Sequence, residues 1–126
     1  MPADLLRVLV TGYALSVVLE TPVLLAALAP PHSWRRRVFA GVWLTACTYP
    51  LLGLVLPTLI DPWAARTAYL AVGETLVPVV EVALFWLAFD RGRGYPRRWL
   101  ARDAGAIVAA NLVSFLLPEL WRAVSR

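Results

Sequence analysis

Residues 64–89 read AARTAYLAVGETLVPVVEVALFWLAF, and the charged side chains among them are Arg66, Glu74 and Glu81. An α-helix needs ~20 mainly apolar residues to cross a hydrocarbon core ~30 Å thick. This stretch therefore predicts a membrane-spanning helix. A carboxylate at membrane depth is energetically expensive, so Glu74 and Glu81 are candidates for a functional site.

The rest of the chain repeats this pattern. It has 126 residues, of which 60% are hydrophobic, and this is too apolar for a soluble domain of that length. We predict an all-α fold, an integral membrane four-helix bundle that forms one domain over residues 1–126. The expected spans are residues 5–29, 38–60, 62–89 and 103–121. The first span contains a further glutamate, Glu20, and Asp103 is expected to cap the fourth helix.

All basic residues are arginines, and most of them lie in the two loops that follow the first and third spans. In a protein with four spans these loops share one side of the membrane. The positive-inside rule then places them in the cytoplasm of a bacterial-type inner (plasma) membrane, with both termini outside. Topology explains the net charge of +4, so we expect a lipid bilayer and not nucleic acid as the partner.

Beyond topology, the arginine loops have a second interpretation. Their guanidinium groups could bind anionic lipid headgroups or a soluble partner at the cytoplasmic face. The residues concerned are Arg35, Arg36, Arg37, Arg97 and Arg98. His32 lies beside the first group, and we interpret it as an interfacial residue and not as a ligand.

A shift of 61 residues aligns the two halves of the chain without gaps. It places Glu20 on Glu81, Pro57 on Pro118, and Arg36-Arg37 on Arg97-Arg98. These matches predict a repeat of residues 1–61 and 62–126, although coincidence among apolar helices is the alternative. Two similar hairpins would be related by a pseudo-twofold axis along the membrane normal.

Helical spacing gathers the polar residues of each span onto one stripe. Counting depth from the span ends puts Glu20, Glu81 and Asn111 in one layer near the midplane. Glu74 lies about two turns, or roughly 10 Å, outward of Glu81. We predict that the stripes face one another inside the bundle. The candidate binding residues are Glu20, Glu81, Glu74, Asn111, Tyr49 and Thr48.

The chemistry of this layer suits a cation. Two carboxylates in a low dielectric do not readily ionise together, so one holds a proton or a cation lies between them. Carboxylate, hydroxyl and amide oxygens suit a proton, Na⁺ or a divalent ion. An organic cation would also fit, with Trp43, Tyr49 or Trp86 as aromatic walls.

Three functions follow from this layer. The first is a membrane protein that binds a proton or small cation, as in a proton-coupled transporter, and four helices favour a homo-oligomer. The second is a non-catalytic subunit of a larger membrane complex, in which the glutamates join helices by hydrogen bonds. The third is a glutamate-dependent intramembrane enzyme, with catalytic residues unknown. We expect no cofactor, and we favour a role without catalysis because no phosphate loop, zinc motif or nucleophile elbow is present.

Overall fold

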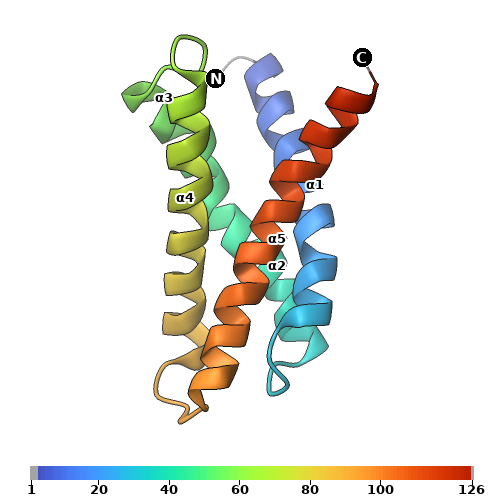
Figure 1. The fold of residues 1–126 in the computed structure, drawn as a ribbon, viewed down its shortest axis with the longest axis vertical. Coiled ribbons are helices and arrows are strands. Elements are labelled where there is room, and N and C mark those ends of the chain that lie inside the picture. Colours follow the sequence, from blue (N-terminus) through green and yellow to red (C-terminus); the bar gives the residue numbers. More distant parts are fainter. Residues whose placement is uncertain (1–2, 126) are drawn as a thin grey trace.

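A computed structural model describes residues 3–125 of the chain as a bundle of long helices (Figure 1). The prediction of an all-α fold is confirmed, as is that of four helices long and apolar enough to cross a membrane. The helical elements are α1 (Ala3–Ala27), α2 (Trp34–Pro50), the π-helical segment η1 (Leu51–Val55), α3 (Leu56–Leu59), α4 (Arg66–Phe85), the π-helical segment η2 (Trp86–Asp90) and α5 (Arg97–Val124).

The bundle has two distinct ends (Figure 1). At the terminal end lie the start of α1, the end of α5 and the connection 60–65. At the arginine end lie the loops 28–33 and 91–96. In the bundle α1 packs on α2 and α5, and α4 packs on α5 and α2. The helices therefore form a ring in which α1 and α4 occupy opposite corners.

The packed apolar core fills the half of the bundle nearer the arginine end. It comes from the last turns of α1, the first turns of α2, the end of α4 and the first half of α5, and its members are Leu24, Leu28, Ala40, Leu44, Phe85, Ala106, Ile107 and Ala110. Large apolar side chains also cover the outside of the bundle, with Val8, Val18 and Val79 each more than half exposed. Buried polar side chains lie next to this core on its terminal side, and they are Glu20, Thr45, Thr48, Glu81 and Asn111.

The fourth helix begins earlier than its apolar run. We expected Asp103 to cap it, and this was wrong, because α5 begins at Arg97 after Pro96 and Asp103 is buried within it. The reason is that residues 97–102 are helical although they are too polar to join an apolar run. Hydropathy detects the apolar part of a helix and not its ends.

Candidate functional site

Glu20 lies in α1 with 4% of its surface exposed. Its Oε2 accepts a hydrogen bond of 2.9 Å from Thr45 Oγ1 of α2. Its Oε1 accepts one of 2.8 Å from Ser114 Oγ of α5. One carboxylate therefore joins three helices in the interior of the bundle.

Glu81 lies in α4 with 2% of its surface exposed. Its Oε1 accepts a hydrogen bond of 2.7 Å from Thr48 Oγ1 of α2, and its Oε2 accepts one of 2.7 Å from Asn111 Nδ2 of α5. Glu81 therefore bridges the same two helices as Glu20, from the opposite corner of the ring. We name these two glutamates and their four donors the glutamate layer.

The hydroxyl donors of this layer each have two acceptors. Thr45 Oγ1 is also 2.8 Å from Gly41 O, and Thr48 Oγ1 is 3.0 Å from Leu44 O. A hydroxyl has one hydrogen and can also accept. When it donates to the helix carbonyl, it can accept a hydrogen bond from a protonated carboxyl. The same heavy-atom positions therefore suit a glutamate with or without its proton.

Asn111 differs from the hydroxyls because its amide carries two hydrogens. One is donated to Glu81 Oε2 and the other, over 2.9 Å, to Ile107 O. Glu81 Oε2 is thus an acceptor in either protonation state. A proton on Glu81 is therefore expected on Oε1, where the O–H of the carboxyl group can donate a hydrogen bond to the hydroxyl oxygen of Thr48.

A cavity of about 270 Å³ connects this layer with the terminal end. Its wall carries Glu20, Glu81 and the half-buried Glu74, together with Thr48, Tyr49 and Asn111. The six residues predicted as a binding site thus line one space. Its remaining lining residues are Ser16, Thr45, Leu52, Arg66, Leu70, Val77, Ser114, Phe115, Pro118, Glu119 and Arg122.

Three exposed charges stand where the cavity meets the terminal end. Glu119 Oε1 is 3.5 Å from Arg66 Nη2 and 3.1 Å from Arg122 Nη1. Exposed ion pairs of this kind contribute at most ~1 kcal/mol. These side chains can therefore separate at little cost.

The aromatic residues expected to line the site divide into two groups. Tyr49 lies on the cavity wall, and its hydroxyl packs against Gly12 of α1. Trp43 instead stacks on Phe39, and Trp86 is 43% exposed on the outside of the bundle. The expectation of an aromatic wall was therefore wrong for both tryptophans, because their faces of α2 and η2 point away from the cavity.

The arginines predicted to contact lipid headgroups or a partner also divide. Arg35, Arg97 and Arg98 are exposed at the arginine end. Arg37 instead donates to Leu25 O over 2.7 Å and to Ala29 O over 2.9 Å. Leu25 lies in the last turn of α1 and Ala29 follows the end of that helix. Arg37 therefore stabilises the C-terminal end of α1.

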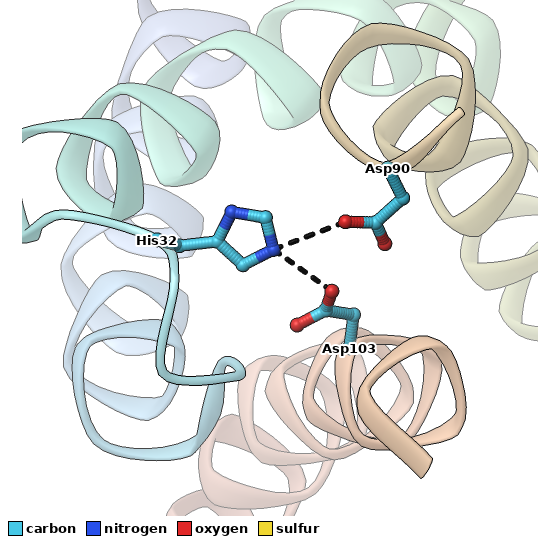
Figure 2. A group of neighbouring side chains, drawn as sticks. All are labelled: His32, Asp90 and Asp103. Atoms are coloured by element: carbon cyan, nitrogen blue, oxygen red, sulfur yellow. Dashed lines mark hydrogen bonds and ion pairs between the residues drawn. The ribbon is translucent and has the colours of Figure 1, made fainter. Parts of the chain in front are cut away.

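One cluster of buried polar side chains was not predicted from the sequence. His32, interpreted there as an interfacial residue, is 3% exposed, and its Nε2 faces both Asp90 and Asp103 (Figure 2). A signal was present, because these residues are a lone histidine and two acids among the arginines of one predicted membrane side. The path of the loop that buries His32 could not be deduced from composition.

No family model, curated protein or solved structure matches this chain. Carboxylate, hydroxyl and amide oxygens converge on one cavity, and such donors suit protons and hard cations. The layer can hold a proton, exchange it, or replace it by a cation from the terminal end.

Proposed function

We propose that this chain is a small polytopic membrane protein that binds a proton or cation at Glu20 and Glu81 and couples the two by exchange. The observation that carries the proposal is the cavity that joins both buried carboxylates to the terminal end. A cation that enters the layer must displace a proton to gain a carboxylate ligand. Proton and cation therefore compete for one site, which is the basis of proton-coupled transport.

The proposed setting is a bacterial-type inner membrane with all four long helices across it. The apolar outer surface of the helices supports this setting, since a bilayer would cover it. The positive-inside rule places the arginine end in the cytoplasm and both termini outside. The cavity then opens to the outside, and the apolar core closes the cytoplasmic half.

A repeat of two hairpins, with its pseudo-twofold axis along the membrane normal, belongs to the same proposal. Its support is that Glu20 and Glu81, the residues aligned by the 61-residue shift, each bridge α2 and α5 from opposite corners. One such bundle encloses a small cavity. We therefore propose that the working unit is a homo-oligomer.

Glu74 is proposed as the access carboxylate. It lies on the cavity wall between the exposed charges and the buried layer, and it is less buried than Glu20 or Glu81. A carboxylate at that position attracts a cation before it reaches the layer. We expect Glu74→Gln to slow transport while leaving the equilibrium affinity of the layer nearly unchanged, as compared by flux and calorimetry.

The test uses full-length chain in proteoliposomes that enclose a pH-sensitive dye. Na⁺, Mg²⁺ and tetramethylammonium are added outside, one at a time. At least one of them should drive protons out of the vesicles that contain the wild type. Glu20→Gln and Glu81→Gln should reduce this flux to the level of protein-free vesicles.

These variants suit the test because glutamine preserves the hydrogen bonds. Its carbonyl accepts from one partner, and its amide donates to a hydroxyl of Thr45, Thr48 or Ser114. The fold should survive, as checked by circular dichroism, while the ionisable group is lost. Asp4→Asn, at an exposed acid in the first turn of α1, is the matched control and should keep the flux. Full flux in both glutamine variants would contradict the proposal, as would no flux with any of the cations.

A second candidate function is favoured by one specific observation. All four carboxylate oxygens of Glu20 and Glu81 already have a donor within the bundle. The layer would therefore also serve a non-catalytic subunit of a larger complex, with the glutamates holding helices together. In that case the glutamine variants stay assembled with their partner complex, and wild-type vesicles show no cation-driven proton flux.

A further inference from the structure

Three buried side chains from separate segments meet at the arginine end (Figure 2). His32 comes from the loop after α1, Asp90 from the last residue of η2 and Asp103 from α5. His32 Nε2 is 3.1 Å from Asp90 Oδ1 and 2.9 Å from Asp103 Oδ2, and side-chain exposure is 0% for the histidine and 2% for each aspartate. The apolar core separates this cluster from the glutamate layer.

Hydrogen bonds leave part of the cluster unsatisfied. An imidazole nitrogen carries at most one hydrogen, yet two carboxylate oxygens point at Nε2. Asp103 Oδ2 makes a hydrogen bond with it, whereas Asp90 Oδ1 has no hydrogen-bond partner among residues 3–125. A buried carboxylate oxygen without a donor is costly. A single cation between the three atoms would satisfy all of them at once.

We propose that His32 Nε2, Asp90 Oδ1 and Asp103 Oδ2 form a binding site for a divalent first-row transition-metal cation. Metal bonds of ~2.1 Å place adjacent ligand atoms ~3.0 Å apart at right angles and ~3.4 Å apart in a tetrahedron. The two Nε2–oxygen distances, 2.9 and 3.1 Å, are close to these values, and each of the three residues offers one ligand atom within 4.8 Å of those of the other two.

Charge and donor type select the class of ion. Two carboxylates and a neutral imidazole carry a charge of −2, which a divalent cation neutralises. Imidazole favours zinc, iron, cobalt or nickel over magnesium or calcium. Three protein ligands leave at least one position for water. A cavity of about 490 Å³ beside α4 and α5 has both aspartates on its otherwise mainly apolar wall.

The surroundings of the ligands hold them in place. Ala29 N donates to Asp103 Oδ1 over 2.8 Å, which leaves Oδ2 turned toward the histidine. The His32 ring packs edge to face on Phe85, with ring centroids 5.0 Å apart. Arg36 Nη1 lies 3.3 Å from Nδ1. When a metal binds Nε2, the neutral ring carries its proton on Nδ1. Nδ1 can then no longer accept a hydrogen bond, so the Arg36 side chain must move away from it.

The site would have a mechanical effect on the bundle. Its ligands come from the α1–α2 loop, the end of η2 and α5, so a bound cation would join the segments that close the arginine end. This effect is independent of the glutamate layer. The metal-site proposal therefore remains valid if the transport proposal fails, and the transport proposal remains valid if no metal binds here.

The test is metal binding by the purified full-length chain in detergent. Zinc is titrated by calorimetry, and cobalt is titrated by its visible absorption, which reports nitrogen and oxygen ligands. We expect one equivalent per chain. His32→Ala and Asp90→Asn should each weaken binding by at least ~100-fold, more than the 10- to 100-fold typical of a lost outer-shell partner.

Two further variants locate the ion. Asp4→Asn is the matched control at an exposed acid, and it should bind like the wild type. The Glu20→Gln, Glu81→Gln double variant should also retain the zinc site. The inference is overturned if the wild type binds neither metal, if folded His32→Ala and Asp90→Asn bind as tightly as the wild type, or if the double variant alone loses binding.

Discussion

At the scale of single residues, the hydroxyl groups decide what the glutamate layer can do. A carboxylate surrounded by amide donors alone would be fixed in its ionised form. Thr45, Thr48 and Ser114 can each donate or accept, so they tolerate both forms of Glu20 and Glu81. The layer therefore combines a rigid arrangement of heavy atoms with mobile protons.

Thr48→Val tests the hydrogen bonding at Glu81. The change keeps the side-chain shape but removes the donor to Oε1, so we expect the free energy of unfolding to fall by ~1–3 kcal/mol. Thr75→Val is the matched control, because Thr75 is exposed and bonds Ala71 O of its own helix. It should change stability by no more than ~0.5 kcal/mol. Denaturant unfolding in detergent measures both, and equal losses would contradict the role given to Thr48.

The residues of the layer were partly predictable from sequence. Depth can be counted along a helix because the rise per residue is constant, and this gave a common level to Glu20, Glu81 and Asn111. Which hydroxyl bonds which carboxylate was not predictable, because it depends on how α2 and α5 are rotated about their axes. His32 was missed because a loop has no such constant geometry.

At the scale of elements, small residues set the distances between helices. A Cβ on Gly41 of α2 would clash with Thr21 Oγ1 and would lie 3.3 Å from Thr21 Cα of α1. The backbones of α1 and α2 are thus as close as glycine permits. This close contact places Thr45, one turn further along α2, beside Glu20.

Gly41→Ala should separate these two helices. Overpacking costs ~1–3 kcal/mol and the better helix propensity of alanine returns ~0.8–1 kcal/mol, so the midpoints of the two ranges give an expected net loss of about 1 kcal/mol. Gly105→Ala in α5 is the matched control, because its new Cβ would meet no atom of the described residues within 4 Å. It should be neutral or stabilising in thermal unfolding. A Gly41→Ala protein as stable as the wild type would contradict the close packing.

Element boundaries were less predictable than the elements themselves. Hydropathy identified four apolar helices but placed the fourth start at residue 103, where the structure has α5 beginning at Arg97. It also gave no sign of the π-helical segments η1 and η2. Helix type depends on local hydrogen bonding, which an apolar run does not encode.

At the scale of the whole molecule, the two halves of the bundle have different interiors. Apolar side chains fill the half at the arginine end, and the cavity occupies the half at the terminal end. The His32 cluster lies beyond the core, at the far side from the cavity mouth. This asymmetry gives the proposed exchange a direction, with entry from the terminal end.

Cysteine labelling tests the orientation in the membrane. Cys47 is first replaced by serine, and one cysteine is then introduced at Trp63 or at Arg93, both exposed and at opposite ends. A membrane-impermeant maleimide should label Trp63→Cys in intact spheroplasts. It should label Arg93→Cys after permeabilisation only. The reverse pattern would place the arginine end outside and contradict the proposed topology.

The proposed function requires that Glu20 and Glu81 exchange a proton for a cation. Infrared difference spectroscopy of the full-length chain, before and after addition of a saturating cation, measures this directly. If these residues release a proton, a carboxylic acid carbonyl band should decrease on cation addition and should be missing in the Glu20→Gln, Glu81→Gln double variant. A band that does not respond to any of the cations, or that persists in the double variant, would contradict it.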